Sequence, residues 1–233
     1  MTLPKIATPK YPITVPSTKK STFFRPFLMK EQKVLMMALE SNNQDQIFQS
    51  MCDIIRVCVD GIDNPASMPM FDLEYLFLKI RSKSVGELID VTVKCPKCGK
   101  SQPKQINLDE VEVVFSEGFT NKVFITDKLG VVLKYPCLKD TSKDFTKMGA
   151  EEIIRYVCDS VDTVFDEENT YTRKDFTQEE VTNFIESMNT SQFEKIAEFY
   201  RNLPQLQKNI DCQCGGCSTD FKVDFRGLQD FFT

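Results

Sequence analysis

The chain has 233 residues, of which 41% are hydrophobic and 27% charged, and this composition is that of an ordinary globular protein rather than a disordered one. The net charge of −5 argues against a general nucleic-acid or membrane-surface binder, because such proteins are usually basic. The absence of histidine excludes Ser-His-Asp and Cys-His catalysis and mixed Cys/His metal sites, which leaves nine cysteines as ligands for a soft metal.

The first 22 residues predict an extended, basic, proline-rich arm. Proline fixes φ and moves the preceding residue to extended geometry, and four prolines occur here: Pro4, Pro9, Pro12 and Pro16. Residues 1–35 carry seven lysines and arginines against one glutamate, a net charge of +6. We expect the arm to be either disordered or ordered by a neighbouring subunit, and either a solvated tail or a segment that lies on an acidic surface.

Residues 23–86 predict a helical region. Apolar residues recur at helical spacing in three runs, from about Arg25 to Leu39, from Ile47 to Val59 and from Leu73 to Ile80. Asp72 is the candidate N-cap of the third helix.

Residues 87–137 predict β structure. Leu88–Lys94 alternates between apolar and polar residues, and Gln105–Val113 is the expected return strand. Lys122–Thr126 and Val131–Tyr135 flank a glycine-containing loop and predict a second hairpin.

Residues 138–206 predict an acidic helical insertion. It starts with a helix and a short strand over Val161–Phe165. Thr177-Gln-Glu-Glu180 and Ser191-Gln-Phe-Glu194 have the spacing of capping boxes and predict two further helix starts. Residues 151–186 hold eleven acids against three bases, a net charge of −8. This surface is either a solvated face or a surface that receives a basic arm.

Two C-x2-C motifs, Cys95-Pro-Lys-Cys98 and Cys214-Gly-Gly-Cys217, each follow a strand-like segment. Two residues between cysteines let one tight turn direct both sulfurs at one point, and two such turns form a tetrahedral four-sulfur site that suits Zn²⁺. We therefore predict that Cys95, Cys98, Cys214 and Cys217 bind structural zinc and leave no open position for a catalytic water. Cys212 is a reserve ligand, and a metal-free fold with buried thiols, iron or a redox pair are the alternatives.

The predicted fold class is α+β, with a metal clip that joins distant parts of the chain. N-terminal helices precede a central β region, and a two-knuckle zinc-ribbon-like element is closed by a C-terminal hairpin. The predicted organisation is an arm at 1–22 and a single α+β domain at 23–233, with helices at 23–86, the β and zinc-ribbon region at 87–137 and 207–227, and the insertion at 138–206. The long gap between the motifs makes such a clip important for stability.

Several sequence blocks lie in a characteristic order: Phe27-Leu-Met-Lys-Glu-Gln-Lys33, Tyr75-Leu-Phe-Leu-Lys-Ile-Arg-Ser-Lys-Ser-Val-Gly-Glu87, Cys95-Pro-Lys-Cys98, Asn107-Leu-Asp-Glu-Val111 and Leu129-Gly-Val-Val-Leu-Lys-Tyr-Pro136. Their order and spacing resemble the baseplate hub proteins of T-even-type contractile-tailed phages, well over residues 23–137 and loosely elsewhere. The resemblance implies a viral protein of the tail baseplate, either a hub subunit or a hub assembly factor, with no catalytic residues to carry over. It also implies other hub, wedge or tail proteins, and copies of itself, as partners.

The expected function is that of a non-enzymatic baseplate hub protein that acts through protein–protein contacts. The alternative is a nucleic-acid-binding zinc ribbon, which lysines around the first motif favour: Lys94, Lys97, Lys100 and Lys104. An enzyme has the least support, because no phosphate-binding loop or nucleophile elbow occurs. No apolar stretch is long enough to span a bilayer and no secretory signal is visible. We therefore expect the protein in the host cytoplasm, with reduced thiols, and in the virion.

Overall fold

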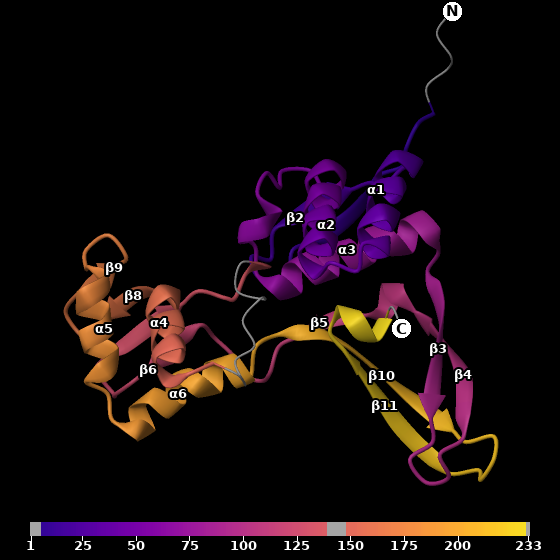
Figure 1. The fold of residues 1–233 in the computed structure, drawn as a ribbon. Coiled ribbons are helices and arrows are strands. Elements are labelled where there is room, and N and C mark those ends of the chain that lie inside the picture. Colours follow the sequence, from indigo (N-terminus) through magenta and orange to yellow (C-terminus); the bar gives the residue numbers. More distant parts are fainter. Residues whose placement is uncertain (1–5, 139–147, 232–233) are drawn as a thin grey trace, which may run out of the picture. The chain divides into compact units, whose positions relative to one another are not determined.

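The computed structural model describes residues 6–138 and 148–231 and divides into two compact units. Unit 1 combines the chain before Phe115 with the chain after Pro204, and unit 2 is Phe115–Pro204. The mixed helix and strand content confirms the predicted α+β class (Figure 1). The insertion predicted at 138–206 differs from unit 2, which starts earlier because the strands after Phe115 pair with a strand that follows the first helix of this unit.

Three helices form the helical part of unit 1, as the apolar periodicity predicted: α1 (Met29–Glu40), α2 (Gln44–Cys58) and α3 (Met70–Val85). Helix α3 is central, and nine of its sixteen residues are buried, including Leu73, Leu76 and Ile80. A helix with buried residues on most of its circumference belongs to the interior of a domain. This helix therefore contributes more buried residues than α1 or α2 does.

Asp72 does not cap α3 as predicted, because Pro69 occupies the N-cap position. Its carboxylate instead accepts hydrogen bonds from the Ser17 backbone N–H, at 2.9 Å, and from the Ser17 hydroxyl. Burial raises the pKa of Asp72, and both bonds to Ser17 act in the opposite direction. Asp72 thus fixes the N-terminal segment on the helices of the same chain.

The N-terminal segment forms a hairpin of β1 (Tyr11–Thr14) and β2 (Ser21–Phe24). Ile13, Val15 and Phe24 are buried. The sequence predicted an arm over 1–22 that is disordered or ordered by a neighbouring subunit, whereas residues 11–22 pack on their own chain. The physical reason is that these apolar side chains are buried and Ser17 binds Asp72, fifty-five positions along the chain.

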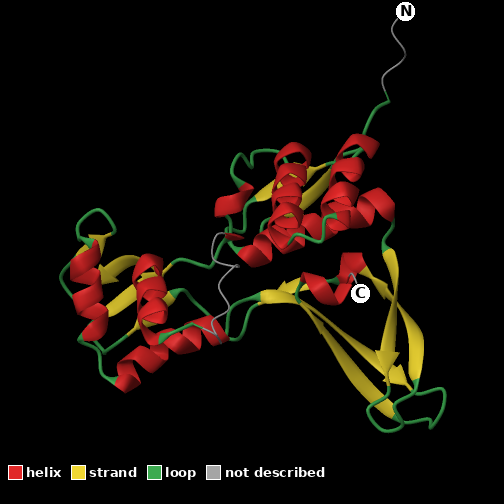
Figure 2. Ribbon diagram, viewed as in Figure 1, coloured by secondary structure: helices red, strands yellow, loops and turns green. Residues whose placement is uncertain are grey.

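Two antiparallel hairpins complete unit 1: β3 (Leu88–Lys94) with β4 (Ser101–Asn107), and β10 (Gln205–Gln213) with β11 (Asp220–Arg226). A short strand, β5 (Glu112–Val114), pairs with the start of β10. The return strand predicted at Gln105–Val113 is therefore wrong in its bounds. The chain leaves β4 at Asn107 and forms a 3-10 turn, η2 (Leu108–Glu110), before β5. Figure 2 shows the two long hairpins of unit 1 extending from its helices.

Strand β3 shows why this region forms a sheet with one covered face. Its side chains alternate strictly between exposed and buried, and Ile89, Val91 and Val93 are the buried ones. Leu206 and Phe225 of the second hairpin are also buried. Alternation with a period of two gives each strand one apolar face, which is why the apolar pattern specifies the register so strongly.

Unit 2 contains a four-stranded antiparallel sheet in the order β6-β7-β8-β9, with β6 (Lys122–Phe124), β7 (Gly130–Leu133), β8 (Val161–Phe165) and β9 (Thr170–Thr172). Its helices are α4 (Ala150–Ser160), α5 (Gln178–Glu186) and α6 (Thr190–Arg201). Val131, Val157 and Ile196 belong to its buried core. Strand β9 escaped sequence reasoning because it is short and all three residues are exposed, so it has no apolar alternation.

The capping boxes of unit 2 give one confirmed prediction and one wrong one. Thr177 caps α5, and Glu180 completes the box. Helix α6 starts earlier than predicted, because Asn189 is its N-cap and Gln192 its box partner, rather than Ser191 with Glu194. Asn189 Oδ1 accepts from the Gln192 N–H at 2.9 Å. Asparagine and serine are comparable N-caps, so residue preference at the cap did not separate Asn189 from Ser191, two positions later.

Candidate metal centre

The loops of the two long hairpins of unit 1 bring four cysteines together. Sγ of Cys95 lies 3.8 Å from Sγ of Cys217, and Sγ of Cys98 lies 3.5 Å from Sγ of Cys214. All four sulfurs lie within 4.8 Å of one another. A tetrahedron with metal–sulfur bonds of about 2.3 Å has sulfur–sulfur edges of about 3.8 Å. The structure therefore places the four predicted cysteines at distances that suit one metal ion.

Cys212, the reserve ligand, lies outside this group of four. It belongs to β10, where it stands opposite Phe221 of β11, and it is buried. Residues two apart in a strand share one face of the sheet. Strand β10 ends at Gln213, so Cys212 lies within the sheet and Cys214 lies in the loop that follows.

The two C-x2-C turns have the same backbone hydrogen bonds. In each, the N–H of the first cysteine donates to the C=O five residues later, and the N–H four residues later donates back to the C=O of that cysteine. The residue at this fourth position has a positive φ, +74° at Gly99 and +53° at Ser218. Glycine tolerates this conformation, whereas serine has a Cβ penalty. Glycine takes this position at the first turn, whereas Ser218, rather than Gly215 or Gly216, takes it at the second.

Hydrogen bonds between the hairpins hold the turns side by side. Gln102 of β4 donates through Nε2 to the Gln213 C=O at 2.9 Å, and its Oε1 accepts from the Gly215 N–H at 2.9 Å. Lys100 Nζ donates to the Gly215 C=O at 3.3 Å. A Cβ on Gly216 would lie 2.7 Å from Lys100 Cδ, so this glycine lets the lysine chain pass close to the turn. These contacts connect the two turns directly beside the four cysteines.

The turn backbone also sets the protonation of the thiols. The N–H groups of Gly216 and Cys217 point at Sγ of Cys214 and lower its pKa to about 6. The Thr219 hydroxyl and N–H lower the pKa of Cys217. At Cys98 the Lys100 N–H acts in the same direction, but hydrogen bonds with the other cysteines outweigh it and raise the pKa to about 11. Thiolate is the form that binds metals, so the backbone N–H groups of the second turn favour the metal-binding form of Cys214.

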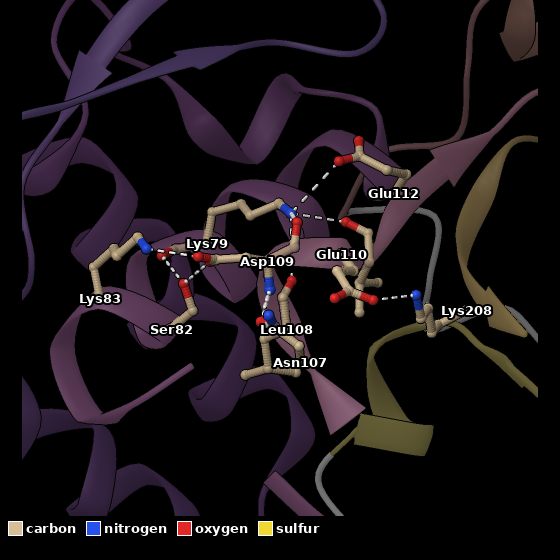
Figure 3. Close-up of polar contacts among 10 residues, drawn as sticks. Lys79, Ser82, Lys83, Asn107, Leu108, Asp109, Glu110, Glu112 and Lys208 are labelled. Atoms are coloured by element: carbon tan, nitrogen blue, oxygen red, sulfur yellow. Dashed lines mark hydrogen bonds and ion pairs between the residues drawn. The ribbon is translucent and has the colours of Figure 1, made fainter. Parts of the chain in front are cut away.

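A second polar group, which sequence reasoning missed, surrounds Lys79 of α3 (Figure 3). The Lys79 side chain is buried, and its Nζ donates to the C=O groups of Leu108, Asp109 and Val111 at 3.3, 2.6 and 2.8 Å. Burial lowers the pKa of Lys79, although the nearby charges of Glu112 and Asp109 favour the ammonium. Lys79 therefore attaches η2 and the start of β5 to the central helix.

Asp109 holds the other side of this group. Its carboxylate accepts from the Ser82 hydroxyl at 2.9 Å and from Lys83 Nζ at 2.6 Å, and its N–H donates to Asn107 Oδ1 at 3.0 Å (Figure 3). Burial alone would raise the pKa of Asp109, but Lys83 and Ser82 outweigh it and the pKa is lowered. These contacts join two of the sequence blocks that carry the family resemblance, Tyr75–Glu87 and Asn107–Val111. The sequence feature that could have indicated this group is Lys79 itself, a lysine between the apolar residues Leu78 and Ile80.

The comparison with protein families decides what kind of protein this is. A family model described as T4 bacteriophage base plate protein matches residues 8–233. The chain belongs to this family. Neither a curated protein nor a solved structure matched.

Membership of the baseplate family confirms the coarser part of the resemblance drawn from the sequence. It implies a location in the virion tail and contacts with other baseplate or tail proteins. In the part of the chain that the structure describes, none of the helices has the length and apolar character needed to cross a bilayer. The family match extends over both units and both C-x2-C motifs.

Proposed function

We propose that this baseplate protein is a hub protein, either a structural subunit or an assembly factor, that acts through protein–protein contacts and has no enzymatic activity. Its family membership and the sequence blocks that resemble hub proteins support the hub assignment. The observation that carries the non-enzymatic role is the closed cysteine site. Of the groups of potential ligands within residues 6–138 and 148–231, only the four-cysteine group gathers around one point.

We further propose that Zn²⁺ occupies the centre as a structural ion. Four thiolates favour zinc or iron, and a tetrahedral site filled by protein side chains is typical of structural zinc. Cys95 and Cys98 would hold the ion from one hairpin, and Cys214 and Cys217 from the other. The ion would fix the two hairpins as one rigid element that presents a constant surface to its partners.

The proposed partners are other hub, wedge or tail proteins, and copies of the same chain. The protein would be made in the cytoplasm of the infected bacterium and function in the tail baseplate. Baseplate family membership supports contact with tail proteins in general.

Mass spectrometry of purified phage particles, with zinc quantified in the same sample, tests the proposal. A hub subunit is expected in finished particles with one zinc per chain, and an assembly factor is expected in isolated baseplate intermediates but not in finished particles. Detection only in free host cytoplasm would overturn the hub assignment. Protein without zinc in either sample would overturn the metal assignment alone.

The second candidate, a nucleic-acid-binding zinc ribbon, is favoured by three exposed lysines at the first turn: Lys94, Lys97 and Lys100. The facing hairpin is not basic, because residues 205–226 hold three lysines and arginines against three aspartates. Lys222 and Arg226 also lie near acids of that hairpin, Asp211 and Asp224, at 3.5 and 3.7 Å. Retention of the purified protein on DNA that weakens steeply with salt would favour this candidate over the hub role.

A further inference from the structure

Unit 1 is built from two segments of the chain that unit 2 separates. The segment before Phe115 supplies the three helices α1 to α3, the hairpin of β3 and β4, and β5. The segment after Pro204 supplies β10, β11 and the C-terminal 3-10 helix η4 (Leu228–Phe231), whose Leu228 and Phe231 are buried. Unit 1 is therefore complete only when both segments meet.

The four cysteines of the centre come in equal numbers from these two segments. Cys95 and Cys98 belong to the first segment and Cys214 and Cys217 to the second, and all four sulfurs lie within 4.8 Å of one another. The hydrogen bonds between the two turns join the same segments. A metal ion that binds all four thiolates would crosslink the two parts of unit 1 across the whole of unit 2. Because the unfolded chain has no preformed site, the free energy of metal binding stabilises the part of the fold that forms the site.

Unit 2 starts and ends at neighbouring positions of unit 1. Val114, the last residue of β5, is the antiparallel partner of Gln205, the first residue of β10. The chain enters unit 2 at Phe115 and leaves it at Pro204, each directly beside one of these partners in the sequence. Paired Cα atoms of an antiparallel ladder lie about 5 Å apart, so the two ends of unit 2 are close together. An insertion with close ends leaves the register of the strands on either side of it intact.

Unit 2 has a hydrophobic core of its own. The buried residues of this core all lie between Ile125 and Phe199, and they come from the sheet and from α4, α5 and α6. Val131, Leu133 and Ile196 are 0% exposed. A continuous segment of about 90 residues with one such core is within the usual size of a domain that folds by itself.

We propose that unit 2 is an independently folding module and that the metal centre stabilises unit 1 alone. The part of the inference that concerns the metal rests on the proposed zinc site. The ion closes a unit that the insertion divides in two, and a crosslink over a long loop removes more entropy from the unfolded chain than one over a short loop. The four ligands all belong to unit 1, so removal of the metal takes no bond from unit 2. Unit 2 therefore keeps its fold when the ion leaves.

Hydrogen–deuterium exchange of the full chain, followed by mass spectrometry of its peptides, tests the inference. The purified protein is compared before and after treatment with a strong chelator, and zinc is quantified in both samples. Chelation is expected to speed exchange about tenfold or more in β3, β4, β10 and β11 and to leave exchange in β7, β8 and α4 unchanged. An equal increase in both units would show that they fold as one. Loss of zinc without faster exchange in unit 1 would show that the metal does not stabilise it, and either result overturns the inference.

A matched pair of core variants tests the independence of unit 2 without reference to the metal. Ile196→Ala shortens a side chain of α6 in unit 2, Leu76→Ala shortens one of α3 in unit 1, and both side chains are 0% exposed. Each variant is expected to speed exchange about tenfold or more within its own unit and to leave the other unit unchanged. Ile196→Ala is also expected to keep its zinc. Ile196→Val and Leu76→Val remove fewer atoms and replace an alanine variant that does not fold.

The outcomes separate this inference from the zinc assignment. Faster exchange in both units, caused by either variant, would refute the independence of unit 2 whether or not zinc is bound. Purified wild-type protein without zinc would overturn the metal assignment and its part of the inference, and the core variants would still distinguish one folding unit from two.

Discussion

Replacing Cys98 by serine removes one of the four proposed zinc ligands, whose sulfurs lie within 4.8 Å of one another. Cys98 is exposed, so the substitution removes little packing and its effect tests the proposed metal clip. The pairs across the centre are 116 and 122 positions apart in the chain. A crosslink over a loop of this length lowers the entropy of the unfolded chain by an amount worth about 5 kcal/mol. We expect Cys98→Ser to lose up to this free energy of unfolding.

For a chain of this size, 1 kcal/mol shifts the unfolding temperature by about 2–4 °C, so the expected decrease is about 10–20 °C. Thermal unfolding followed by circular dichroism, with zinc measured in the same samples, checks this expectation. Wild-type protein treated with a strong chelator should unfold close to the Cys98→Ser temperature. The variant itself should respond little to the chelator.

Cys212→Ser is the matched control, because this buried thiol lies outside the group of four. It is expected to keep one zinc and to lose about 1 kcal/mol from weaker packing. Wild-type protein that binds no zinc, or Cys98→Ser protein that unfolds with the wild type, would refute the clip. Loss of zinc from Cys212→Ser would transfer the ligand role to Cys212.

Three further outcomes follow from the described contacts. Lys79→Met leaves three backbone carbonyls without their donor and is expected to lower the free energy of unfolding in urea by about 3 kcal/mol. The control Lys208→Met breaks one half-exposed ion pair and should lower it by less than about 1 kcal/mol. Equal effects of the two variants would show that Lys79 does not attach η2 to α3. Gly99→Ser should lower the free energy of unfolding by about 1 kcal/mol because φ is positive at Gly99, and Ser218→Gly should leave it unchanged or raise it. An unfolding temperature that is higher for Gly99→Ser than for Ser218→Gly would contradict the turn geometry. Because the folded pKa of Asp109 is lowered, its stabilisation is present above the unfolded pKa of about 3.9 and lost as pH falls through the folded value. Wild type should therefore exceed Asp109→Asn in urea unfolding at pH 7 by about 1 kcal/mol and converge with it only as pH falls through the folded pKa of Asp109, which lies below about 3.9. A gap that persists in stronger acid would refute the assignment.

Elements with a strong local pattern could be predicted from the sequence. Leu88–Lys94 and Val161–Phe165 were predicted with the bounds that the structure has, because each is a β-rich stretch with clear limits. The three helices of the N-terminal region followed from apolar spacing, and their ends moved by a few residues. The C-x2-C motifs could be recognised because a tight turn is a local object whose geometry depends on four or five neighbouring residues.

Contacts between distant residues could not be predicted in the same way. The N-terminal hairpin folds back because Ser17 meets Asp72, and neither residue carries a local sign of the other. Lys79 is satisfied by three carbonyl groups, and backbone carbonyls have no sequence signature. The extent of unit 2 depends on β7 pairing with β8, which is a choice of strand partner.

The sequence by itself determined which kinds of catalytic and metal-binding groups the protein can form. The absence of histidine excludes histidine-based catalysis and mixed Cys/His metal sites, and the two C-x2-C motifs predict a four-sulfur centre from residue types and spacing alone. The motif spacing favoured Cys214 over Cys212, and the tertiary structure decided that the two motifs meet: Cys214 joins the other three cysteines at the loops, whereas Cys212 stays within the sheet. The chemistry of a side chain depends on its own residue type, so the sequence shows it directly. Whether two hairpins meet depends on the whole unit, which buries Ile89, Val91 and Val93 on one face of β3.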